Sequence, residues 1–186
     1  MVTLLLALSG CRAAPQPPPA TACPELVWVE QVGSKFREFF TGVDIATNGD
    51  ILVGGGFSGT VTFGHDLAGE PVTRSACGNN DHNDAFVARY LPDGRVRSVS
   101  ILSSCDITRV QAIAATPSGG AVASGMFDDR LEVDGTVFRN EAVAEFHLQL
   151  WVASWSADGD LEWLVLDQAR SLGLSGRVIK EREKMA

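Results

Sequence analysis

Residues 42–57 read GVDIATNGDILVGGGF, and residues 112–127 read AIAATPSGGAVASGMF. Gly49 corresponds to Gly119 and Phe57 to Phe127, and both pairs share one spacing along the chain. In both stretches two short apolar runs flank a glycine-containing turn signal, a pattern typical of two antiparallel strands joined by a tight turn. Self-similarity at a fixed spacing predicts a repeat architecture.

A second pair of similar stretches completes each copy. Residues 84–94 read DAFVARYLPDG, and residues 149–159 read QLWVASWSADG, at a slightly shorter spacing than the first pair. Apolar residues fall on both alternating faces of these runs, which favours strands that are covered on both sides. Each copy therefore predicts four short strands, and a repeated four-stranded unit is typical of a β-propeller blade. We predict blade one at about 43–102 and blade two at about 110–167.

These residues resemble a known family. The stretch 42–57, followed by SGTVTFG at 58–64 and DAFVARY at 84–90, is similar to the SBBP-type β-propeller repeat. The resemblance covers roughly residues 26–170. It implies a propeller fold and a secreted or lipid-anchored protein of the kind frequent in myxobacteria and their relatives, and it says almost nothing about a ligand.

The repeat count predicts an unfinished array. Residues 26–30, 96–100 and 161–165 align as closing strands, so residues 26–176 hold one extra strand and two blades. A third blade is expected to begin near residue 177, but residues 177–186 form a charged tail without the motif. Propellers typically have 4–8 blades, so we expect an all-β, incomplete β-propeller-like array.

The missing blades leave three alternatives: a truncated or frame-shifted product, assembly with other chains, or an open, smaller β-structure. In the isolated chain we expect the outward faces of the first and last sheets to stay uncovered. Exposed sheet edges also favour self-association.

The N-terminal segment has the features of an export signal. Residues 2–8 form a short apolar run that ends in small residues, which is typical of a secretory signal peptide. Residues 8–11, LSGC, resemble the bacterial lipobox, which implies cleavage before Cys11 and acylation of its thiol. We therefore predict a lipoprotein signal peptide at 1–10 and a Pro/Ala-rich tether at 11–25. Residues 1–3 carry no Lys or Arg, which departs from the pattern; the alternative is a chance apolar N-terminus with a free cysteine.

The resemblance to lipoproteins also implies a location. Arg12, rather than Asp, follows Cys11, and in Gram-negative lipoproteins this favours the outer membrane. We predict a protein held at the bacterial cell envelope through a lipid anchor.

The other cysteines lie at 23, 77 and 105. Cys77 and Cys105 flank the third and fourth strands predicted for blade one, close to register at the open end of that hairpin. Their equivalents in blade two, Ala142 and Arg170, are both non-cysteine. Because exported proteins readily form disulfides, we predict a Cys77–Cys105 bond. The alternatives are two free thiols or a bond with Cys23.

No catalytic, cofactor-binding or metal-binding residue is predicted. Residues 79–84, NNDHND, loosely resemble a calcium loop, but an EF-hand loop requires Gly and Glu where Asp84 and Tyr90 stand. The remaining candidates are expected to be surface histidines, solvated turn aspartates and blade-core tryptophans: His65, His82 and His147; Asp128 and Asp129; Trp151, Trp155 and Trp163.

Composition narrows the function further. The net charge of −8 excludes general nucleic-acid binding, and no apolar stretch is long enough for a transmembrane helix. We predict a lipid-anchored envelope protein that binds an unknown protein or glycan, or serves as structure, without catalysis. The alternatives are an exported propeller-scaffold enzyme, such as a lyase or glycan hydrolase, and a truncated, non-functional fragment of a longer propeller.

Overall fold

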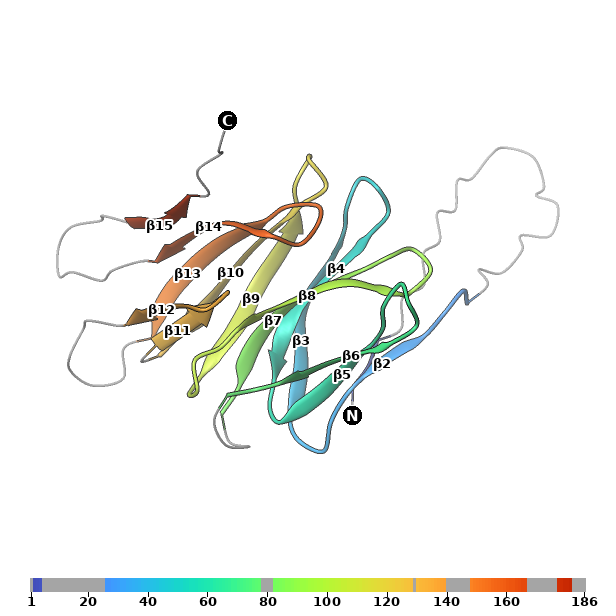
Figure 1. Ribbon diagram of the computed structural model, residues 1–186, viewed down its shortest axis with the longest axis horizontal. Helices are drawn as coiled ribbons and strands as arrows, with labels where there is room; N and C mark the ends of the chain where they lie inside the picture. The colour runs from blue at the N-terminus through green and yellow to red at the C-terminus, as the bar shows by residue number, and fades with distance from the viewer. Residues whose placement is uncertain are drawn as a thin grey trace, which may run out of the picture.

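The computed structural model describes residues 2–4, 26–77, 82–128, 130–139, 148–166 and 177–181. This part of the chain is all-β, as predicted, and contains no helix. Its strands form antiparallel sheets, none of them closed (Figure 1). Within the described residues, no helix is long and apolar enough to span a membrane.

Two larger sheets share one topology. Sheet 1 has the order β3-β4-β7-β8, and sheet 2 has the order β9-β10-β13-β14, with β15 added beside β14. The strands of sheet 1 are β3 (Glu38–Ile45), β4 (Ile51–Phe57), β7 (Asp84–Tyr90) and β8 (Val96–Leu102). Those of sheet 2 are β9 (Thr108–Ala115), β10 (Ala121–Phe127), β13 (Gln149–Trp155), β14 (Leu161–Leu166) and β15 (Arg177–Glu181).

Each sheet carries an inserted hairpin between its second and third strands. The insert of sheet 1 is β5 (Thr60–His65) with β6 (Pro71–Ser75), and that of sheet 2 is β11 (Arg130–Val133) with β12 (Thr136–Arg139). Neither hairpin was predicted from the sequence. A further short sheet pairs β1 (Val2–Leu4) with β2 (Glu30–Val32).

The predicted turns are present and explain the equivalence of the two sheets. In the β3–β4 turn the Gly49 amide donates to Ala46 O, and in the β9–β10 turn the Gly119 amide donates to Thr116 O, both at 2.9 Å. The two glycines have φ values of +86° and +83°, in the left-handed region that L-residues with side chains rarely adopt.

Sheets 1 and 2 stack face to face around a shared core. Val87 and Leu102 of sheet 1, Trp151 and Leu164 of sheet 2, and Phe138 of the inserted hairpin all belong to this core. The opposite face of sheet 1 packs on β5, β6 and β2 through a second core that includes Phe57, Phe63 and Phe86. Sheet 1 is therefore covered on both faces over β4 and β7, contrary to the expectation that its outward face would stay open, whereas Val43 and Ile45 of β3 remain exposed.

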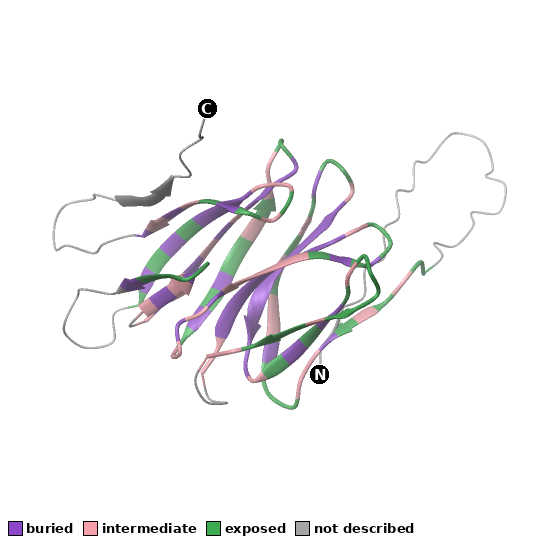
Figure 2. Ribbon diagram, in the orientation of Figure 1, coloured by how far each residue is buried: buried purple, intermediate pink, exposed green. Residues whose placement is uncertain are grey.

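The central strands of sheet 1 are more deeply buried than those of sheet 2 (Figure 2). Every residue of β4 and β7 is buried, as predicted for strands covered on two sides. Residues of β10 instead alternate between buried and half-buried. One face of sheet 2 consequently has no cover among the described residues.

Two boundaries differ from the sequence prediction. The extra strand expected at residues 26–30 is β2, at Glu30–Val32, and it pairs with β1 rather than with sheet 1. Residues 177–181 of the expected tail form β15, which pairs with β14 at the edge of sheet 2. A charged segment can join a sheet edge because backbone groups alone make the ladder.

Candidate functional site

The predicted disulfide between Cys77 and Cys105 is present, with a Cα–Cα distance of 4.5 Å. Beside it lies the buried carboxylate of Asp84, at the first position of β7. Asp84 accepts hydrogen bonds from Cys77 N at 2.7 Å, Ser103 Oγ at 2.8 Å and Ser104 N at 3.1 Å. Burial raises the pKa of Asp84, and these hydrogen bonds oppose that shift. The cluster ties two loops to one strand.

A histidine–carboxylate pair lies near the same disulfide. His82 Nδ1 is 2.9 Å from Asp106 Oδ1, and both side chains are about one-third exposed. Of the candidate loop 79–84, only residues 82–84 are described; His147, Asp129 and Cys11 also lie outside the described residues. His65 is exposed at the end of β5. No group of three or more His, Cys, Asp or Glu side chains suited to a metal ion occurs among the described residues.

A buried ion cluster joins the two sheets. Asp50 Oδ2 lies 3.1 Å from Arg89 Nη1 and 3.0 Å from Arg97 Nε. Arg89 Nη2 also donates to Gly119 O of the β9–β10 turn at 2.7 Å. The arrangement satisfies one buried carboxylate with two guanidinium groups, and it connects sheet 1 to a turn of sheet 2. An arginine within the apolar run of β7 was the sequence signal for it.

The tryptophans divide between the two faces of sheet 2. Trp151 and Trp155 are buried in the core between the sheets, as predicted. Trp163 pairs with Ser154 in the ladder, so it lies on the opposite face and is half-buried. Its assignment to the blade core was wrong, because the alternation of β14 places Leu164 there instead.

This opposite side of sheet 2, here called the outer face, is largely apolar. Cross-strand register places on it the apolar residues Ala112, Ala114, Val122, Met126, Leu150, Val152, Trp163 and Val165, together with the polar residues Arg109, Ser124 and Ser154. Leu150 is 48% exposed and Val152 is 37% exposed. Exposed apolar rows of this kind mark interaction surfaces more often than isolated exposed residues do.

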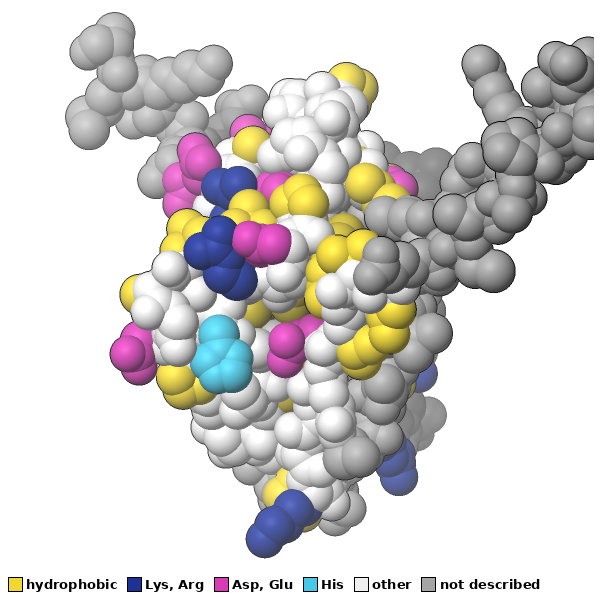
Figure 3. Space-filling view, turned by 90° about the vertical axis from the view of Figure 1, so that its right-hand side faces the viewer, with side chains coloured by type: hydrophobic (Ala, Val, Ile, Leu, Met, Phe, Trp, Pro, Cys, Tyr) yellow, Lys and Arg dark blue, Asp and Glu magenta, His cyan; other side chains and the backbone are white. Residues whose placement is uncertain are grey.

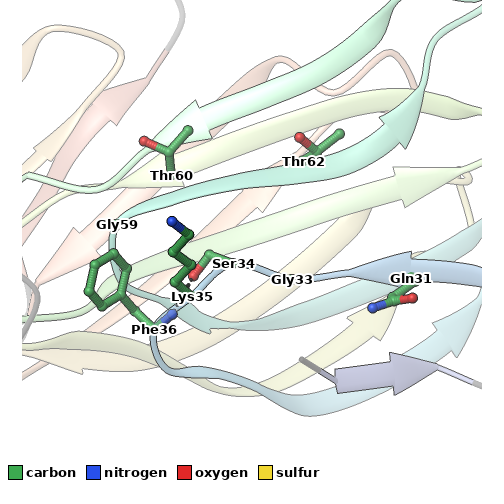
Figure 4. A pocket seen from close by; sticks show the side chains of 8 residues that line it. All are labelled: Gln31, Gly33, Ser34, Lys35, Phe36, Gly59, Thr60 and Thr62. Carbon is green, nitrogen blue, oxygen red and sulfur yellow. Dashed lines mark hydrogen bonds between the residues drawn. The ribbon is translucent and has the colours of Figure 1, made fainter.

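A groove of about 550 Å³ opens between the segment after β2 and strand β5. Its lining residues are Gln31, Gly33, Ser34, Lys35, Phe36, Gly59, Thr60 and Thr62 (Figure 4). Figure 3 views the side of the molecule on which β2 and β5 lie in Figure 1, and there basic, acidic and apolar side chains are intermixed. Gly59, Thr60 and Thr62 belong to the repeat-like stretch 58–64, but none of the lining residues was predicted to bind a ligand.

Comparison of the chain with known protein families and with curated protein sequences found no match in either case.

Proposed function

We propose that this chain is a lipid-anchored, non-catalytic β-propeller-type module of the cell envelope, and that it assembles by adding further four-stranded units to its outer face. One observation carries the proposal. Residues 26–37, which precede sheet 1, contact the first unit in the same way as β8 and the loop after it contact the second unit.

Backbone contacts support this equivalence directly. Ser58 N donates to Arg37 O at 3.0 Å, and at the equivalent positions of the next unit Asp128 N donates to Ile107 O at 3.1 Å. The bridge between Gly33 and Thr62 likewise corresponds to the bridge between Ser103 and Glu132. Residues 26–37 thus support the β5–β6 hairpin as the end of β8 supports the β11–β12 hairpin.

A side-chain contact repeats in the same way. Trp28 Nε1 donates to Pro92 O at 2.9 Å, and its ring lies against Gly94. In the next unit Ser98 takes the place of Trp28 and lies against Gly159. The segment before sheet 1 therefore acts as the last strand of a preceding unit, which favours a chain of units over two independent sheets.

A side chain on the outer face matches, in size, a side chain that is exposed on β3, so a second copy of the chain could pack there. Between the sheets, Ile113 packs against Gly42, where a Cβ atom would lie 3.0 Å from Ile113 Cγ2. Val43, the equivalent of Ile113, is 49% exposed on β3, and Ala112, the equivalent of Gly42, is exposed on the outer face. The Ile113–Gly42 contact between the sheets would correspond to a Val43–Ala112 contact between two copies. The carbon that Val lacks relative to Ile is offset by the methyl group that Ala has and Gly lacks. At this pair of positions, β3 of one copy therefore matches the outer face of another, whereas Phe40 and Ser124 replace the Val110 and Gly54 that meet between the sheets.

Such a contact is heterologous, and it closes a ring only if the rotation between copies allows it. Propellers have roughly 4–8 blades, so about two to four copies with two blades each would close one. The lipobox-like residues 8–11 and the tether at 11–25 support anchoring of this assembly to a membrane.

The mass of the purified chain tests the assembly. We expect concentration-dependent association in sedimentation velocity, and we expect Leu150→Lys/Val152→Lys to remain monomeric. Val137→Lys is the matched control, because Val137 is 45% exposed on β12, away from the outer face. A monomeric wild-type chain, or association that the double variant leaves unchanged, would contradict the proposal.

A further inference from the structure

The groove between β2 and β5 differs chemically from the corresponding place in the second unit. The two bridges, Gly33 to Thr62 and Ser103 to Glu132, fix the equivalence of the two places at the spacing that also relates Gly49 to Gly119. By the same spacing, Thr60 corresponds to Arg130, and Lys35 corresponds to Cys105.

In the second unit two of the corresponding positions carry side chains that are bonded within the chain. Arg130 forms an ion pair with Glu132 on β11, and Cys105 is held in the disulfide with Cys77. In the first unit Thr60 and Thr62 replace the ion pair, and their smaller side chains line an open groove. The groove thus differs from the corresponding place in the second unit at most of its lining positions, including Thr60, Thr62 and Lys35.

The groove of the first unit carries a positively charged side chain, that of Lys35. Lys35 is exposed at the groove, and it has no ion-pair partner within the part of the chain that the structure describes. Figure 4 shows its side chain extending from the segment after β2 toward β5. The carboxylate of Glu38 is buried and accepts a hydrogen bond from Ser34 Oγ, so that group is already engaged. The Lys35 ammonium is thus available for a charge-assisted hydrogen bond to an anionic group of a ligand.

The rest of the lining suits a hydroxyl-rich ring. Thr60 Oγ1 and Thr62 Oγ1 pair with Ser75 Oγ and Thr73 Oγ1 across the hairpin, and each hydroxyl retains a further lone pair for a ligand. Gln31 adds an amide at one end of the groove. At the other end the half-exposed ring of Phe36 lies against Gly59 and presents an apolar surface.

We propose that this groove binds an acidic sugar, with the sugar carboxylate at Lys35, its hydroxyls along Thr60, Thr62 and Gln31, and the apolar face of its ring against Phe36. The volume of about 550 Å³ falls within the range of small-ligand pockets. This inference goes beyond the proposed function and does not depend on assembly.

Titration of the full-length chain with glucuronate, followed by ¹H–¹⁵N NMR, tests the proposal. We expect saturable shifts at the groove residues that weaken with added salt, because the contact is an exposed ion pair. Glucose, which lacks the carboxylate, and acetate, which lacks the ring, are the matched probes, and both are expected to bind at least about tenfold more weakly, equivalent to a loss of about 1.4 kcal/mol.

Two variants connect the binding to the groove. Lys35→Gln should weaken glucuronate binding about tenfold or more, whereas Arg109→Gln, which removes an equal charge on β9, should leave it unchanged. Thr60→Arg/Thr62→Glu installs the ion pair of the second unit and should abolish binding without loss of the fold, as judged by circular dichroism. Equal binding by Lys35→Gln, equal binding of acetate, or no saturable shift with glucuronate would overturn the proposal.

Discussion

Arg89 Nη1 lies 3.1 Å from Asp50 Oδ2, and the two side chains are only 3% and 2% exposed. The pair is distant in the chain and is brought together because Leu52 of β4 pairs with Arg89 of β7. Since Arg89 also donates to Gly119 O, this one side chain satisfies a buried carboxylate and holds the turn of the neighbouring sheet.

Arg89→Met should therefore destabilise the protein strongly. Removing one partner of a buried ion pair leaves an uncompensated charge and typically costs about 3–5 kcal/mol. Because Arg97 still contacts Asp50, we expect the free energy of unfolding in urea to fall by about 3 kcal/mol, the lower end of this range. Arg95→Met is the control: Arg95 pairs with Asp93 in an exposed turn, where water screens the pair, so its loss should have little effect on stability. Similar effects of the two substitutions would show that the buried cluster has no special role.

Cys77→Ala/Cys105→Ala tests the disulfide. The bond closes a loop with a sequence separation of 28, for which a loss of about 2–4 kcal/mol in unfolding free energy is expected. Peptide mapping of exported, unreduced protein should recover the linked pair. Recovery of both thiols as free groups, or of a peptide linked through Cys23, would contradict the assignment.

The contact of Asp44 with the second sheet should depend on pH. Asp44 Oδ2 accepts a hydrogen bond from Ala115 N at 2.7 Å, and this bond, with a smaller contribution from Ile45 N, holds the pKa of Asp44 below its usual 3.8. A carboxyl pKa that is lower in the folded state adds stability above 3.8, and that stability is lost as the pH falls through the folded value.

Asp44→Ala should consequently lower the unfolding free energy at pH 7 by about 0.5–1 kcal/mol, because the hydrogen bond is at the surface. The difference from wild type should shrink as the pH falls below 3.8. Asp158→Ala, in the exposed β13–β14 turn, should have little effect at either pH. A difference that is constant from pH 7 to the acid range would rule out an ionised Asp44 as the acceptor.

The predicted anchor is tested on the expressed chain rather than on the folded domain. Acylation at Cys11 should place the protein in the detergent phase of a phase-separation assay, because each CH₂ group of an acyl chain that is buried in a membrane contributes about 0.8 kcal/mol of favourable free energy. Cys11→Ser should move it to the aqueous phase, and Cys23→Ser should not. Equal partitioning of wild type and Cys11→Ser would contradict a lipid anchor.

The four strands of each sheet could be predicted from local residues because each turn carries its own signal. Gly49 and Gly119 stand where the backbone needs a positive φ, and apolar runs flank them. The β5–β6 hairpin was missed, although Val61 and Phe63 are buried and alternate with exposed Thr60 and Thr62. A short strand between polar loops gives too brief an alternation to stand out from a connection.

The groove and the ion cluster could not be predicted in the same way, because neither belongs to one segment. The groove exists only where the residues after β2 meet β5, as the bridge from Gly33 to Thr62 records. Its lining has threonines in place of Arg130 and Glu132, a difference that can be recognised only after the two hairpins have been aligned in space. Local patterns predict strands, whereas sites of this kind depend on register between distant strands.

Gly54 should be essential to the stacking of the two sheets. A Cβ atom at this position would lie 2.8 Å from Val110 Cγ1 of β9, closer than packed carbons come without movement. Gly54→Ala is therefore expected to cost about 1–3 kcal/mol in urea unfolding, the usual cost of overpacking a core. Val110→Ala alone should also destabilise, because it leaves a cavity in the core. The double variant Gly54→Ala/Val110→Ala, however, should be more stable than the sum of the two losses predicts, because each change makes room for the other. Strict additivity would show that Gly54 and Val110 are not in contact, and the stacking of sheet 1 on sheet 2 would then have to be different from that described here.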